Sequence, residues 1–121
     1  MCNIVCLNKE GCLTIKNKDK SLKEISNVKD MIIIRKNNIL IYVNEKKYIE
    51  YLDLKTLKFV NNKENTIQFK SKFETDLFYL KKNNIKINII RKFTNEKLFY
   101  ILSTHKDLLV FNVSSGKLLF K

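Results

Sequence analysis

Short apolar runs separated by short polar segments cover almost the whole chain. The runs are rich in Ile, Val, Tyr and Phe, and Asn, Lys, Asp or Ser bounds each of them. That pattern is typical of β-strands joined by turns. The sequence therefore predicts an all-β protein built from antiparallel sheets. The predicted strands are 3–7, 12–16, 22–26, 31–35, 39–43, 48–53, 58–60, 66–70, 76–80, 86–91, 98–102, 108–112 and 117–120.

The predicted strands differ in how many apolar faces they have. Residues 66–70 and 86–89 alternate polar and apolar side chains, as strands with one solvent-exposed face do. Residues 32–34, 39–43 and 98–102 are apolar on both faces, so we expect these strands to be buried between packed layers. A mixture of two-sided and one-sided strands is typical of the blades of a β-propeller.

Two segments are also compatible with a helix. Ser21 followed by Glu24 resembles a capping box at a helix N-terminus, but a strand of a hairpin explains residues 22–26 equally well. Residues 73–80 could form a helical turn, although the three consecutive residues Leu77, Phe78 and Tyr79 favour a strand.

Asparagine takes the place of glycine in the predicted turns. The chain has only two Gly and no Pro, whereas tight turns often need a residue that tolerates a positive φ. Asn tolerates that region. The pairs Asn37-Asn38, Asn61-Asn62 and Asn83-Asn84 each lie between two apolar runs, so we interpret them as hairpin turns.

One arrangement of strands and turns occurs twice. Residues 39–60 contain an apolar strand, a charged turn, a strand ending in Asp53, a short turn and an apolar strand. Residues 98–120 keep the same order, with Asn112 in the place of the aspartate. Repeated hairpins of this kind indicate stacked sheet units, as in propellers.

Residues 95–120 resemble the body of a WD-repeat blade. Phe111-Asn112 stands where that family has its Trp-Asp dipeptide, and Leu52-Asp53 stands there in residues 31–60. The resemblance implies a single domain over residues 1–121 that forms a partial WD-repeat-like β-propeller of two to three blades, approximately 1–30, 31–65 and 66–121. Because a blade takes ~40–45 residues and a ring needs at least four blades, the chain would be part of a longer protein, stack on another chain, or close its sheets differently.

The net charge of +12 has two explanations. Clustered cations bind phosphate, but the chain has 22 Lys, 15 Asn and 15 Ile against only two Arg, Arg35 and Arg91. An A+T-rich coding sequence over-supplies Lys, Asn and Ile, and the lysines are scattered along the whole chain. We therefore favour compositional drift over selection for phosphate binding.

The residue types that carry chemistry do not form a catalytic or metal motif. Cys2, Cys6 and Cys12 are an odd number without a C-x-x-C pair, and the single histidine, His105, lies far from them. We predict no catalytic residue, no cofactor and no metal site, and hence no enzyme. No segment has the ~20 apolar residues of a membrane span. We expect an intracellular protein, cytoplasmic or nuclear/nucleolar, with no membrane partner.

Resemblance to WD-repeat proteins implies a non-enzymatic scaffold for protein interactions within a larger assembly, for example a ribosome-maturation or other RNA-handling complex. Its partners would be other protein subunits or the remaining blades of a longer chain. The predicted partner-binding residues lie in or near turns: Lys46, Lys47, Tyr48, Phe73, His105 and Lys106. The alternative is a small basic β-barrel or β-sheet protein that binds RNA or DNA directly through Lys81, Lys82, Lys86, Arg91 and Lys92.

Overall fold

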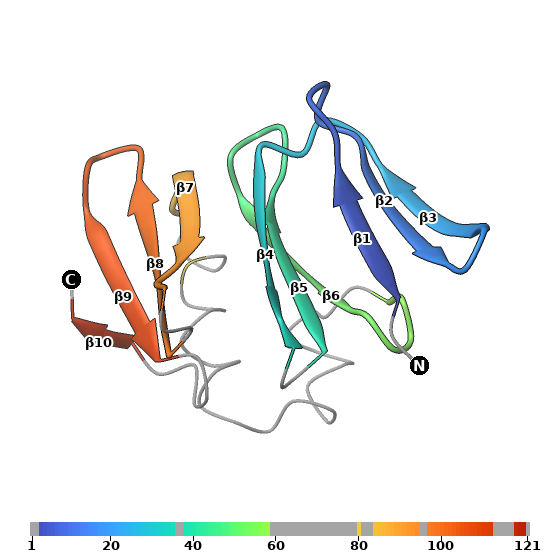
Figure 1. Cartoon of the computed structure of the whole chain (residues 1–121). Coiled ribbons are helices and arrows are strands. Elements are labelled where there is room, and N and C mark those ends of the chain that lie inside the picture. Colours follow the sequence, from blue (N-terminus) through green and yellow to red (C-terminus); the bar gives the residue numbers. More distant parts are fainter. Residues whose placement is uncertain are drawn as a thin grey trace.

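The protein forms three antiparallel β-sheets that stand side by side, from the first sheet at the right of Figure 1 to the last at the left. A computed structural model describes residues 3–35, 38–58, 80, 84–94, 97–112 and 118–120. The first sheet contains β1 (Ile4–Leu7), β2 (Leu13–Asn17) and β3 (Lys20–Ile25), and the central sheet contains β4 (Asp30–Ile34), β5 (Ile39–Val43) and β6 (Ile49–Asp53). The last sheet has the order β10-β9-β8-β7 and contains β7 (Ile87–Lys92), β8 (Leu98–Ser103), β9 (Leu108–Asn112) and β10 (Leu118–Phe120). The predicted all-β class with antiparallel sheets is confirmed.

Most of the described strands coincide with predicted ones to within two residues. Residues 22–26 fall largely in β3, so the strand was the correct interpretation there and the helix was wrong. Of the predicted strands 58–60 and 76–80, only Lys58 and Leu80 are described, and neither is in a strand. Residues 59–60 and 76–79, and residues 73–79 of the possible helical turn, lie outside the described residues. The predicted strand 66–70 lies outside the described residues. The apolar runs in the sequence therefore locate the described strands.

Several turns use a left-handed backbone without glycine. Asn38, between β4 and β5, has a φ of 53°, and Asn84, just before β7, has a φ of 54°. The expectation that Asn replaces Gly in turns is therefore confirmed at these two positions, while Asn37, Asn61, Asn62 and Asn83 lie outside the described residues. Lysine takes the same conformation at three turns that the sequence did not single out: Lys18, Lys47 and Lys106.

The central sheet packs on both of its faces. Alternate residues of β5 point to opposite sides, because successive side chains of a strand do so. Ile39, Ile41 and Val43 belong to the core shared with the last sheet, whereas Leu40 and Tyr42 belong to the core shared with the first sheet. The molecule is therefore a three-layer stack with two separate hydrophobic cores.

Predicted two-sided burial is correct for one strand and wrong for another. All five residues of β5 are buried, as expected for residues 39–43. In β8 the buried residues alternate with partly exposed ones, and Leu98, Tyr100 and Leu102 are on the partly exposed side. The reason is position, because β5 lies in the middle layer and β8 lies in an end layer.

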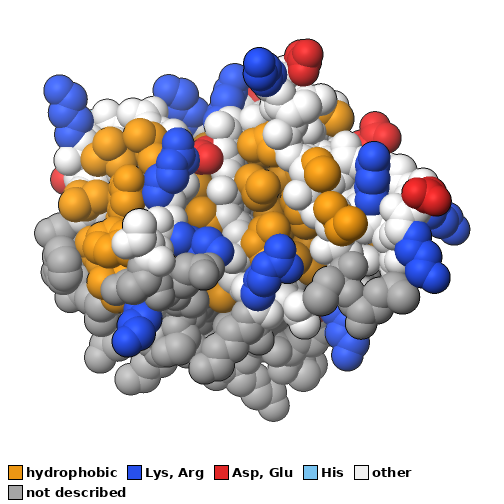
Figure 2. All heavy atoms as spheres, viewed as in Figure 1, with side chains coloured by type: hydrophobic (Ala, Val, Ile, Leu, Met, Phe, Trp, Pro, Cys, Tyr) orange, Lys and Arg blue, Asp and Glu red, His pale blue; other side chains and the backbone are white. Residues whose placement is uncertain are grey.

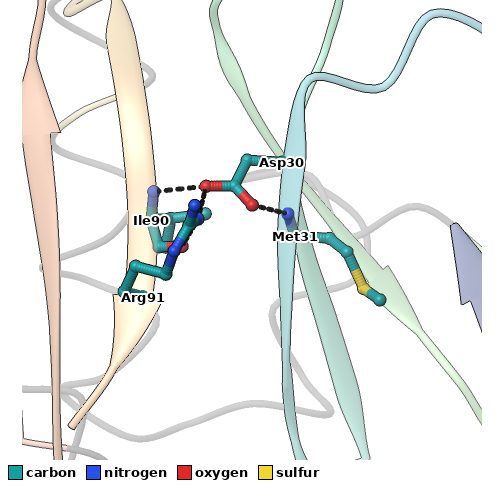
Figure 3. Close-up of polar contacts among 4 residues, drawn as sticks. All are labelled: Asp30, Met31, Ile90 and Arg91. Carbon is teal, nitrogen blue, oxygen red and sulfur yellow. Dashed lines mark hydrogen bonds and ion pairs between the residues drawn. The ribbon is translucent and has the colours of Figure 1, made fainter. Parts of the chain in front are cut away.

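Asp30 ties the central sheet to the last sheet (Figure 3). Its Oδ2 accepts a hydrogen bond from the backbone N–H of Ile90 at 3.0 Å and pairs with the guanidinium of Arg91, while its Oδ1 accepts from the N–H of Met31 at 3.0 Å. Because β7 is an edge strand of its sheet, Asp30 gives an otherwise open backbone N–H a partner. The stack is thus held by polar contacts at the sheet edges as well as by its apolar cores.

Candidate functional site

The same five-residue turn occurs once in each sheet. It joins β1 to β2, β5 to β6, and β8 to β9, and it begins at Asn8, Asn44 and Ser103. In each case the side-chain oxygen of this first residue accepts hydrogen bonds from the backbone N–H groups two and four residues later, over distances of 2.9 to 3.2 Å. Side-chain caps of this kind fix a turn locally.

The backbone of the three turns also matches. The fourth residue of each turn has a positive φ, which is 86° at Gly11, 72° at Lys47 and 68° at Lys106. Its N–H donates to the carbonyl of the first residue at 3.1, 2.9 and 3.0 Å respectively. Nine residues after each first residue comes Asn17, Asp53 or Asn112. The repeat therefore extends to the first sheet, where the sequence comparison of residues 39–60 with 98–120 did not find it.

A shared polar pattern could have revealed this third copy. Asn8 and Asn17 have the same spacing as Asn44 and Asp53, and as Ser103 and Asn112. The apolar runs around them vary in length and in residue type. The residue in the left-handed position is Gly in one turn and Lys in the other two. Those differences hide the copy when apolar runs alone are compared.

The three turns lie along one edge of the stack, at the top of Figure 1. Two of them are joined through the start of β7, because the N–H of Ile87 donates to the carbonyl of Lys47 at 2.7 Å and the N–H of Thr104 donates to the carbonyl of Lys86 at 3.0 Å. The Nζ of Lys47 also donates to Asn88 Oδ1 at 3.2 Å. We call residues 44–48, 86–88 and 103–107 the turn edge.

Most of the predicted partner-binding residues are brought together on the turn edge. They are Lys46, Lys47 and Tyr48 from one turn, and His105 and Lys106 from the next. Tyr48 is half-buried, whereas the other four side chains are exposed. The amine of Lys86 lies 5.9 Å from the centre of the Tyr48 ring, within the range of a cation–π contact. Phe73 lies outside the described residues.

The turn edge carries charges of both signs. Glu45 and Asp107 belong to the same two turns as the lysines and are exposed. Figure 2 shows blue Lys and Arg side chains and red Asp and Glu side chains near one another at the top of the molecule. A surface that carries both signs of charge on a fixed backbone favours recognition of another folded, charged surface.

The residues predicted to bind nucleic acid are not brought together in one patch. Lys86 lies on the turn edge, just before β7, whereas Arg91 and Lys92 are at the far end of that strand, about 17 Å away. Arg91 pairs with Asp30, and the Nζ of Lys92 donates to the carbonyl of Ile33 at 3.2 Å. Both side chains therefore connect sheets. Lys81 and Lys82 lie outside the described residues.

The hydroxyl beside the single histidine is part of a turn. Ser103 is only 1% exposed, and its Oγ accepts hydrogen bonds from the N–H groups of His105 and Asp107. It thus has a structural role. Within the part of the chain that the structure describes, no group of three His, Cys, Asp or Glu side chains could hold a metal ion. No helix among these residues is long and apolar enough to cross a membrane.

Comparison with known proteins gives no family for this chain. No protein-family model matches it, and a search of curated proteins found no match. The resemblance of residues 95–120 to a WD-repeat blade therefore stays a prediction from the sequence.

Proposed function

We propose that this protein is a non-enzymatic scaffold that binds protein partners within a larger assembly and is built as a WD-repeat-like propeller segment. The turn edge would be its binding surface. Lys46, Lys47, His105 and Lys106 would contact the partner, and Tyr48 with Lys86 over its ring would form the centre of the contact. Tyrosine is among the residues enriched in protein interfaces.

The observation that supports this proposal is the repetition of one rigid turn along one edge. Each turn is fixed by its own side-chain cap, and backbone hydrogen bonds link the second and third turns to β7. The main chain of these turns loses little conformational entropy when a partner binds, because it is already ordered. Loops held by a rigid scaffold are where binding residues concentrate.

A setting in ribosome maturation or another RNA-handling complex is an expectation from family analogy. The strongly basic composition, with a net charge of +12, is compatible with such surroundings because excess positive charge attracts nucleic acid without sequence specificity.

The test is affinity capture with matched charge variants. The full chain and a Lys46→Glu, Lys106→Glu variant are used as bait, and a Lys16→Glu, Lys20→Glu variant is the control because it makes the same charge change away from the turn edge. We expect a defined protein partner that survives nuclease treatment, is retained by the control, and is lost with the turn-edge variant. Equal capture by all three baits would contradict the proposal.

The same experiment addresses direct nucleic-acid binding, the second candidate function. The observation that favours it is the position of Lys86 over the Tyr48 ring, with Lys46 and Lys47 in the same turn as Tyr48. Direct binding predicts that the captured material disappears after nuclease treatment, and that the affinity of the purified chain for RNA falls steeply with salt. Protein binding through a surface of mixed charge predicts a shallow salt dependence.

A further inference from the structure

A cavity opens between the first and central sheets on the edge opposite the repeated turns. Its volume is about 420 Å³, which is within the range of small-molecule sites. It is lined by the ends of strands from both sheets and by the segment after β6. The lining residues are Asn3, Asn17, Leu22, Ile33, Arg35, Asn38, Leu54, Lys55 and Leu57.

The charged side chains among the described residues that line this cavity are all positive. Arg35 and Lys55 line the cavity, and none of the described residues that line it is a carboxylate. Asp53, close by in the sequence, is buried, and its Oδ1 accepts hydrogen bonds from the N–H groups of Lys55 and Thr56 at 2.8 and 3.4 Å. In the described part of the chain, the side chains of Arg35 and Lys55 make no hydrogen bond or ion pair. Two unpaired cations at one cavity favour an anionic ligand.

Arg35 is also unusual for this chain. There are only two Arg against 22 Lys, so compositional drift toward Lys does not account for an Arg. The other one, Arg91, pairs with Asp30 between two sheets. Arginine differs from lysine in presenting a planar fork of donors that matches phosphate oxygens. Its presence at the cavity, where it has no structural partner among the described residues, fits phosphate recognition.

The rest of the cavity offers apolar walls and amides. Leu22, Ile33 and Leu57 are half-buried and Leu54 is buried. Asn17 and Asn38 each carry a side-chain donor and acceptor, whereas the Nδ2 of Asn3 already donates to the carbonyl of Leu54 at 2.9 Å. Flat apolar faces and a polar edge with both donors and acceptors are the features of a nucleobase.

The backbone around the cavity is held in an unusual conformation. Leu57 has a φ of 61° and Asn38 has a φ of 53°, and a left-handed Leu is uncommon. Backbone hydrogen bonds maintain this shape. The N–H of Leu57 donates to the backbone carbonyl of Asp53 at 2.7 Å, and the N–H of Leu54 donates to the backbone carbonyl of Asn38 at 2.8 Å. Strain of this kind concentrates at ligand sites. The cavity wall is thus fixed before any ligand arrives.

We propose that this cavity binds a nucleotide, with the phosphate between Arg35 and Lys55, the base against Leu22, Ile33 and Leu57, and the base edge at Asn17 and Asn38. The shared chemistry is a base joined to a phosphate, which both a free mononucleotide and a nucleotide of single-stranded RNA supply. This inference does not depend on the scaffold function, because it concerns the opposite edge of the stack.

The test is titration of the full chain by isothermal calorimetry with the four nucleoside 5′-monophosphates, the four nucleosides, inorganic phosphate and a four-nucleotide RNA. We expect saturable binding of at least one mononucleotide and about tenfold or greater weakening in an Arg35→Gln, Lys55→Gln variant. A Lys9→Gln, Lys29→Gln variant removes the same charge from exposed positions near the opposite edge of the stack, so it is the matched control and should bind as the wild type does. Circular dichroism melting establishes that each variant is folded.

The arms of the experiment separate the sources of the ligand. Tighter binding of the RNA than of any mononucleotide, lost in the Arg35→Gln, Lys55→Gln variant, assigns the cavity to single-stranded RNA, and equal or weaker binding assigns it to free nucleotides. The proposal is overturned if no nucleotide or RNA binds saturably, if the cavity variant and the control bind alike, or if inorganic phosphate binds as tightly as the nucleotides do.

Discussion

The two end sheets of the stack differ in their outer faces. On the first sheet, the register places Ile4, Cys6, Thr14, Lys16 and Glu24 on the side away from the central sheet, and most of this face is polar. On the last sheet, the corresponding side carries the apolar residues Ile89, Leu98, Tyr100, Leu102, Leu108 and Val110 together with Arg91 and Asn112, and Leu108 is 44% exposed. One end of the stack is therefore mostly polar and the other is mostly apolar.

This difference explains why strands with the same sequence character have different burial. β5 and β8 both consist almost entirely of apolar residues, but only β5 has a sheet on each side. The apolar outer residues of β8 keep part of their surface exposed, because the last sheet packs only one face on the central sheet. Exposed apolar faces of this kind mark places where further protein packs.

The largest expected effect on stability distinguishes a residue on the inner face of the last sheet from one on its outer face. Phe99 is fully buried and stacks on Phe111 with ring centres 4.9 Å apart, so Phe99→Ala should lower the free energy of unfolding by about 3–5 kcal/mol. Phe93 is 37% exposed and contacts Tyr100 edge to face, so Phe93→Ala should cost about 1 kcal/mol or less. Urea denaturation measures both, and similar losses would contradict the assignment of faces.

A smaller effect is expected where the last sheet is tied to the central sheet. Asp30→Ala removes the acceptor for the N–H of Ile90 and the partner of Arg91. We expect it to lower the free energy of unfolding by about 2 kcal/mol, because a partly buried donor loses its partner. Asp19→Ala in the exposed turn between β2 and β3 is the control. Equal urea midpoints for the two variants would show that Asp30 does not hold the sheets together.

The limits of sequence analysis are visible in these same residues. Apolar runs identify β5, β8 and β9 because strand formation depends on local composition. The Asp30–Ile90 contact spans 60 residues in the sequence and depends on how two sheet edges meet, which no local pattern encodes. The cavity at Arg35 and Lys55 escaped prediction for the same reason, since its two cations come from different strand ends.

The turn edge was partly predictable. The notion that turn residues such as Lys46 and Lys106 would bind partners followed from their positions in polar segments between apolar runs. That Lys86 joins them depends on backbone hydrogen bonds from Ile87 and Thr104, which follow from the packing of the last sheet against the central one. Lys92 was assigned to a nucleic-acid patch from its charge alone, and in the structure it bonds to the carbonyl of Ile33.

Alkaline pH should weaken both cores through their tyrosines. Burial, with a smaller effect of the Glu50 charge, raises the pKa of Tyr42, in the core shared with the first sheet, to about 12. The same two causes raise the pKa of Tyr51, in the core shared with the last sheet, well above 10. In the unfolded chain a tyrosine loses its proton near pH 10. Between pH 10 and 12 the unfolded state therefore binds fewer protons than the folded state, so stability falls as the pH rises.

The loss assigned to Tyr42 amounts to roughly 1.4 kcal/mol for each pH unit in that interval. Tyr42→Phe should flatten the decrease in unfolding free energy measured by urea denaturation at pH 9, 10 and 11. Tyr100→Phe, which removes a phenol from a partly exposed position, serves as the control. Parallel pH profiles for wild type and Tyr42→Phe would rule out this contribution.

The smallest effect on stability, and the most direct test of the difference between the end sheets, comes from placing a charge on each outer face. Leu108 and Ile4 are 44% and 56% exposed, so Leu108→Lys and Ile4→Lys should each change the unfolding free energy by about 0.5 kcal/mol or less.

At about 0.3 M salt, where repulsion between the basic chains is screened, the wild type should self-associate through the apolar face of the last sheet. Light scattering should then show a lower mean mass for Leu108→Lys and an unchanged mass for Ile4→Lys. A wild type that stays monomeric at all concentrations, or an equal response to both variants, would mean that the two ends of the stack do not differ in solution.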